Sequence, residues 1–172
     1  CGQHVALGIP SGADTYALFT NVIWDANLHF ETDLFVDMID WLVKTIDFFS
    51  SMPQKHLIVR VHPAEVLGTI KSKQMAAEEI SKSFEQLPIN VHLIEPTNSD
   101  LDTYSVIEEC DVALVYGTKA AIEIAALGKT VVVCGSAWVR GKGFTIDPQT
   151  VNEYKKILST PCNQLQMSTS AK

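Results

Sequence analysis

Short hydrophobic runs alternate along the chain with segments in which hydrophobic residues recur every three or four positions. The runs are nearly continuous, which is typical of strands covered on both faces of a sheet. They predict strands over residues 17–24, 56–61, 90–95, 111–116 and 130–134.

The segments between and after these runs predict helices. In residues 33–50, DLFVDMIDWLVKTIDFFS, the hydrophobic positions fall on one side of a helix and the acidic positions elsewhere. Pro148 suits the first position of the last helix, where proline is favoured. The other helices are expected over 65–86, 101–109 and 118–127, and the last over 148–158.

Regular alternation of strands and helices predicts an α/β fold. We expect a doubly wound, mostly parallel open sheet of about five or six strands, with helices on both faces. The domain is expected over residues 17–159, after an N-terminal segment or linker, 1–16. Residues 160–172 are rich in Ser, Thr and Gln and are expected to form a flexible tail.

Composition excludes several classes of protein. The chain has 172 residues, 47% of them hydrophobic, which suits one domain with a substantial core. A net charge of -7 argues against a nucleic-acid partner, because phosphate contacts need a basic face. No hydrophobic run is long enough to predict a transmembrane segment.

The four cysteines are scattered, without the spacing of a metal site, so no metal is expected. Cys110 and Cys134 lie in helix-like and strand-like contexts and are expected to be buried, reduced thiols.

Doubly wound sheets bind ligands beyond the carboxyl ends of their strands, so the loops at those ends carry the candidate chemistry. His62 follows one strand directly and is held by Pro63. Its ring can donate a hydrogen bond to a phosphate, or it can be a half-buried histidine bonded to a carbonyl group. Both interpretations stay open.

A second candidate is the turn Gly117-Thr118-Lys119, which opens a predicted helix. Glycine allows close approach of a ligand, Thr118 is a good N-cap, and free N–H groups at a helix start attract phosphate. The alternative is an ordinary cap beside a solvated lysine.

Glu123 is the acidic residue of this predicted, otherwise apolar helix. Its carboxylate can reach the cleft and accept hydrogen bonds from ribose hydroxyls, or it can lie on the solvent edge of the helix.

Weaker candidates follow the first and last strands. Arg140 and Lys142 lie among glycines and can wrap an anion, although the same composition makes a flexible surface loop. Asp25 and Asn27 can face the cleft or simply form a turn. No catalytic triad, carboxylate pair or metal motif is visible, so the sequence identifies no catalytic residue.

Five segments resemble, in order, the capsular polysaccharide biosynthesis proteins, which are glycosyltransferases of the GT-B type. The segments are FTNVIWDAN, IVRVHPAE, NVHLIEP, DTYSVIEECDVALVYGTKAAIEIAALGKTVVVCG and RGKGFTIDP, within residues 17–150. The resemblance implies the C-terminal, nucleotide-sugar-binding half, which is a Rossmann-like half of a GT-B fold. It implies donor-phosphate contacts for His62 and Thr118 and a ribose contact for Glu123. Lys119 and Ala121 depart from the family's turn, which has Thr and Gly at these positions.

The resemblance therefore implies the donor-binding domain of a glycosyltransferase for capsular or surface polysaccharide. Its partners would be a nucleotide sugar and, through an N-terminal domain outside this chain, a glycan acceptor. No cofactor is implied, and the expected location is the cytoplasm, free or peripheral to the inner membrane.

Two alternatives remain. One is a relative of UDP-N-acetylglucosamine 2-epimerase, although Ile124 replaces the second residue of the expected glutamate pair. The other is a truncated, non-catalytic interaction domain whose helix over 34–49 exposes an apolar face, with homo-oligomerisation as one way of covering it.

Overall fold

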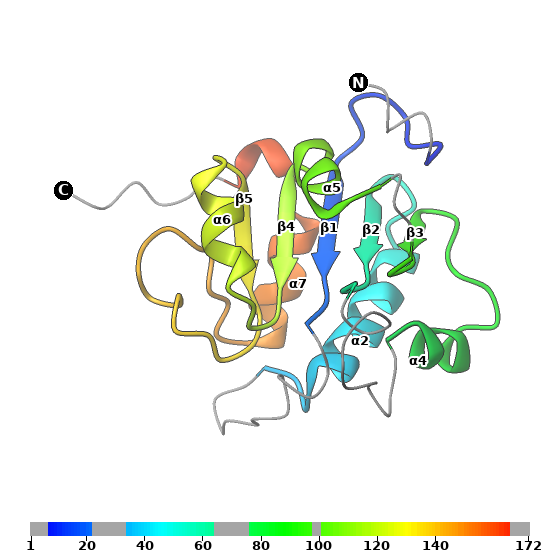
Figure 1. Cartoon of the computed structure of the whole chain (residues 1–172), viewed down its shortest axis with the longest axis horizontal. Helices are drawn as coiled ribbons and strands as arrows, with labels where there is room; N and C mark the ends of the chain where they lie inside the picture. Colours follow the sequence, from blue (N-terminus) through cyan, green and yellow to red (C-terminus); the bar gives the residue numbers. More distant parts are fainter. Residues whose placement is uncertain (1–6, 22–33, 64–75, 98–100, 166–172) are drawn as a thin grey trace.

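A five-stranded parallel sheet forms the centre of the protein (Figure 1). The computed structural model describes residues 7–21, 34–63, 76–97 and 101–165. Its strands are β1 (Thr15–Phe19), β2 (His56–Arg60), β3 (Val91–Ile94), β4 (Val112–Val115) and β5 (Thr130–Val133). They lie in the order β3-β2-β1-β4-β5, and each neighbouring pair is parallel.

Helices cover both faces of this sheet, which confirms the predicted doubly wound α/β class. Side chains of α2 (Met38–Ser50), α4 (Ala76–Ser83) and α7 (Val151–Ser159) belong to one core cluster. Those of α5 (Thr103–Glu109) and α6 (Ala120–Ala126) belong to a second cluster on the opposite face. Figure 1 shows α5 and α6 in front of the sheet and α2 and α7 behind it.

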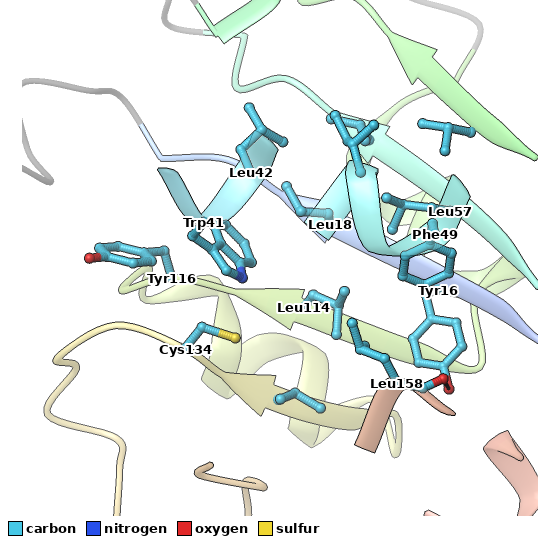
Figure 2. Packing of buried hydrophobic residues seen from close by; sticks show 14 of the residues in the cluster. Tyr16, Leu18, Trp41, Leu42, Phe49, Leu57, Leu114, Tyr116, Cys134 and Leu158 are labelled. Carbon is cyan, nitrogen blue, oxygen red and sulfur yellow. Dashed lines mark hydrogen bonds between the residues drawn. The ribbon is translucent and has the colours of Figure 1, made fainter. Parts of the chain in front are cut away.

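The strands supply both cores because successive side chains point to opposite faces. In β1, Tyr16 and Leu18 enter the α2/α7 core, whereas Ala17 and Phe19 enter the α5/α6 core. Figure 2 shows the first of these cores around Trp41 and Leu114. Both cores need apolar residues, so the strands read as continuous runs.

The hydrophobic stripe of α2 packs on the chain's own sheet. Six residues of this helix are buried: Met38, Trp41, Leu42, Thr45, Ile46 and Phe49. The exposed apolar face that would have favoured an interaction domain is therefore not formed by these residues.

A buried polar network joins α2 to α7. The Trp41 indole N–H donates to the Tyr154 hydroxyl at 3.1 Å, and the Thr45 and Tyr154 hydroxyls lie 2.9 Å apart. The Thr45 hydroxyl donates to the carbonyl of Trp41 at 2.7 Å, so Tyr154 donates to Thr45. Burial raises the pKa of Tyr154, which keeps its phenol protonated.

The last helix begins later than predicted. Its first residue is Val151, and the Thr150 hydroxyl caps it by accepting from the backbone N–H of Glu153 at 3.1 Å. The prediction that Pro148 occupies the first helical position was therefore wrong. A threonine cap satisfies a free amide group, which proline at the start of the helix would not.

The chain remains attached to the sheet beyond α7. Lys55 is buried, and its ammonium donates to the carbonyl of Thr160 at 2.6 Å and to the Tyr16 hydroxyl at 3.2 Å. It also lies 3.3 Å from the Asp14 carboxylate. Residues 160–165 are thus packed on the domain, in contrast to the predicted tail, and β1 includes Thr15 and Tyr16 from the predicted linker.

Cys110 and Cys134 are buried, as expected, and burial raises the pKa of the Cys110 thiol to about 12. Within the described ranges, no helix combines the length and hydrophobicity that a bilayer crossing requires.

Two histidines on β2 and β3 predict a dependence of stability on pH. The Nδ1 atom of His56 lies 3.1 Å from Nε2 of His92, and burial followed by the His56 charge lowers the pKa of His92. Below its ordinary pKa of about 6.5, the unfolded chain therefore binds more protons than the folded one, and stability falls as pH falls.

We expect a lower urea midpoint at about pH 5.5 than at about pH 7.5, because this range spans the ordinary histidine pKa. The variant His92→Gln should show a smaller difference between the two pH values. An identical pH dependence in this variant would show that the pair does not contribute.

Candidate functional site

The main candidate site is a cavity at the carboxyl ends of β1, β2 and β4. The chain runs from β1 to β2 on one side, while β4 lies on the other side of β1, so the winding direction changes between β1 and β4. Open α/β sheets bind ligands at such switch points. The cavity measures about 260 Å³ and is lined by Phe19, Thr20, Arg60, His62, Pro63, Thr103, Tyr104, Ile107, Thr118, Ala120 and Glu123.

The cavity brings together His62, Thr118 and Glu123, which are far apart along the chain. It lies on the face of the sheet covered by α5 and α6, because both helices contribute lining residues. Three of the predicted binding residues therefore line the same cavity.

His62 reaches the cavity through the alternation of β2. Side chains at every second position share a face, so His62 follows Ile58, which packs in the α5/α6 core. The His62 backbone N–H donates to the Thr20 hydroxyl at 2.9 Å and joins the ends of β1 and β2. Burial and then the charge of Arg60 lower the pKa of His62, so at neutral pH its ring is neutral, with one donor and one acceptor nitrogen.

The turn after β4 places Thr118 at the cavity wall. The helix α6 begins at Ala120, later than predicted, and its N-cap position is Lys119, which makes no side-chain cap. The Thr118 hydroxyl instead accepts from the N–H of Ala120 at 3.3 Å. The prediction that Thr118 is the N-cap was wrong by one position. Lys119 is exposed and is not among the lining residues.

Gly117 precedes Thr118 and is exposed. A methyl group at this position would meet the Asn21 side-chain nitrogen at 3.8 Å and the Ser136 carbonyl oxygen at 3.9 Å, which are ordinary contacts. The fold alone therefore leaves room for alanine here.

Glu123 lies in the first turn of α6 and lines the cavity. Ala121 and Ile124 fill the buried side of this helix, whereas Glu123 itself is exposed. Its carboxylate thus stays in contact with solvent beside the cavity.

Arg140 has a structural role. Its guanidinium donates to the carbonyls of Val133 at 3.0 Å, Gly135 at 3.3 Å and Pro148 at 2.6 Å. These bonds hold the loop after β5 against the sheet. Neither Arg140 nor the exposed Lys142 is among the residues that line the cavity. Asp25 and Asn27 lie outside the described residues.

The lining also includes residues that were not predicted as site residues, among them Thr20, Arg60 and Tyr104. Arg60 shares the face of Ile58 and His62, so the two-residue period of β2 could have identified it. Tyr104 lies in the helix predicted over 101–109, where Val106 and Ile107 are buried and Tyr104 is 59% exposed. Nothing in the local sequence distinguishes it.

A second polar cluster lies before β1 and β4. One ligand atom each from Asp14, Asp111 and Cys162 lies within 4.8 Å of the others. Asp14 pairs with Lys55, however, and Asp111 accepts from the backbone N–H of Thr15 at 2.9 Å. These carboxylates therefore already have partners within the fold.

Comparison with solved structures supports the fold. Thermosulfurimonas dismutans KpsC, a beta Kdo 2,4 transferase, has a TM-score of 0.54 and 17% identity, with 84% of this chain and 40% of that chain covered. The KpsC beta Kdo 2,7 transferase of the same organism has a TM-score of 0.50 and 17% identity, covering 82% and 40%. The alpha,alpha-trehalose 6-phosphate synthase of Burkholderia multivorans has a TM-score of 0.56 and 13% identity, covering 96% and 38%.

At these identities the likeness concerns the fold, which is α/β, Rossmann-like and similar to GT-B glycosyltransferase folds. The chain spans about two fifths of the length of these structures. No curated protein sequence matches it. The family model of the capsule polysaccharide biosynthesis proteins matches residues 17–167. This match covers most of the sequence, and the chain therefore belongs to the capsule polysaccharide biosynthesis protein family.

Proposed function

We propose that this chain is the donor-binding domain of a glycosyltransferase that builds capsular or surface polysaccharide, and that its ligand is a nucleotide sugar. The observation that carries the proposal is the meeting of His62, Thr118 and Glu123 in one cavity at the switch point of the sheet. A phosphate-binding hydroxyl, a histidine and a carboxylate together suit a phosphorylated sugar.

Thr118 and His62 are the phosphate ligands in this proposal. The Thr118 oxygen accepts from Ala120, so its own hydrogen remains available to a phosphate oxygen. The neutral His62 ring can donate one N–H to the same group. Gly117 has no side chain, which allows the phosphate to approach the backbone of the turn.

Glu123 and Tyr104 then bind the nucleoside. A carboxylate is an acceptor, so Glu123 receives hydrogen bonds from the ribose hydroxyls. The exposed ring of Tyr104 lines the same cavity and offers a flat surface on which a base can stack. The acceptor glycan and the catalytic base belong, in this proposal, to a second domain, and the buried thiols Cys110 and Cys134 suit a cytoplasmic location.

Titration calorimetry with CMP, UDP and GDP and their sugar conjugates tests the proposal. We expect binding of one nucleotide class, weakened roughly tenfold or more by His62→Ala and by Glu123→Ala, because hydrogen bonds to charged groups contribute about 1.5–3 kcal/mol.

Glu108→Ala is the matched control, since Glu108 is an exposed glutamate of α5 that is not among the cavity residues. It should bind as the unmodified protein does. Absence of binding to every nucleotide at millimolar concentration, with folded protein, would refute the donor-site proposal.

A further inference from the structure

Arg60 is a buried cation at the cavity wall. It ends β2, is only 4% exposed, and lines the same cavity as His62. Its Nη1 atom donates to the carbonyl of Glu95 at 2.6 Å. Its Nε atom is buried, and no described residue accepts a hydrogen bond from it.

No carboxylate of a described residue forms an ion pair with Arg60. The ion pairs found in the described parts of the chain are Lys44–Asp40, Lys55–Asp14 and Lys82–Glu79. Asp102 is the acidic group whose charge acts on Arg60, but its carboxylate caps α5 through the N–H of Ser105 at 2.7 Å.

A buried charge without a paired counter-charge costs several kcal/mol in a folded protein. An anion in the adjoining cavity would offset this cost. Nη1 donates to the carbonyl of Glu95, so the edge of the guanidinium that carries Nε and Nη2 remains for a ligand. Two parallel donors on one edge match the two oxygens of a carboxylate or phosphate, which a lysine ammonium does not.

We propose that Arg60 binds an oxyanion of the ligand through this edge. The proposal rests on the proposed function and adds a residue that the sequence motifs do not identify. The oxyanion is either a phosphate of the nucleotide or a carboxylate of an acidic sugar attached to it, because both present the same pair of oxygens.

Calorimetry with Arg60→Met tests this assignment, using a nucleoside, its mono- and diphosphate, and the nucleotide linked to neutral and to acidic sugars. Loss of roughly tenfold or more in affinity for the bare nucleotides, with the nucleoside unaffected, identifies the phosphate as the partner. Loss confined to the acidic-sugar conjugate identifies the carboxylate. Either result supports the proposal.

Arg60→Lys covers the case in which the methionine variant does not fold, because it keeps the charge beside Glu95 and loses the paired donors. It should bind more weakly than the unmodified protein. Lys142→Met removes an exposed cation outside the cavity lining and should have no effect.

Unchanged affinity of Arg60→Lys and of any folded Arg60→Met for all ligands, while His62→Ala and Glu123→Ala still weaken binding, would overturn this inference alone. If the unmodified protein binds none of the ligands, the proposed function fails and this inference fails with it.

Discussion

Replacing Trp41 by alanine is expected to lower the free energy of unfolding by about 3–5 kcal/mol. Trp41 is fully buried, and its ring centroid lies 5.6 Å from that of Tyr116. The substitution leaves a cavity beneath the sheet and removes the N–H that donates to Tyr154. Domains of this kind are stable by only about 5–15 kcal/mol, so urea denaturation should show a much lower midpoint.

Trp41→Phe separates the two causes. It keeps an aromatic ring but removes the N–H, and we expect a loss of about 1–3 kcal/mol, smaller than for alanine. A midpoint for Trp41→Ala close to that of the unmodified protein would contradict the packing described here.

We expect the substitution Trp41→Ala to affect the candidate site as well. Tyr116 directly precedes Gly117, and its ring packs with Trp41 in the α2/α7 core, on the face of the sheet opposite the candidate site. We therefore expect the folded fraction of Trp41→Ala to bind nucleotide more weakly than the unmodified protein does. Such a result would show that Tyr116, directly after β4, couples the core to the candidate site.

The burial of α2 was predictable because its apolar residues follow a helical period. The strands were predictable as strands for the opposite reason, since continuous hydrophobic runs require burial on both faces. For the same reason, a continuous hydrophobic run does not indicate which of its side chains pack against the helices on one face and which against those on the other. Arg60 is the exception: it is polar and lies two positions before His62, so the strand period assigns both residues to the same face of the sheet.

The position of the candidate site was predictable where it depends on strand ends. His62 and Thr118 follow β2 and β4, and parallel strands bring their carboxyl ends to one edge. The structural role of Arg140 was not predictable, because its partners are backbone carbonyl groups. Every residue has such a group, so the sequence does not indicate which of them an arginine will bind. Tyr104 could not be assigned to the cavity from the sequence, because the seven residues of α5 are too few to define a hydrophobic face.

Two glycines at neighbouring strand ends should respond differently to the same added methyl group. At Gly135 the new carbon would lie 2.6 Å from the Tyr116 carbonyl oxygen and 2.8 Å from an atom of its ring. That oxygen already accepts the Gly135 N–H at 2.8 Å, so it cannot move away without breaking the bond. We expect Gly135→Ala to lose about 1–3 kcal/mol of stability in urea denaturation.

Gly117→Ala should be nearly neutral for folding, within about 0.5 kcal/mol, because its contacts would be ordinary. Nucleotide affinity should nevertheless fall roughly tenfold, since the methyl group would stand where the proposed phosphate approaches the turn. The unchanged stability of Gly117→Ala is the control, because it shows that a loss of affinity does not come from unfolding. If Gly117→Ala binds nucleotide as tightly as the unmodified protein, the turn is not part of the phosphate site. If Gly135→Ala is as stable as the unmodified protein, the residues that follow β4 and β5 are not packed as closely as described here.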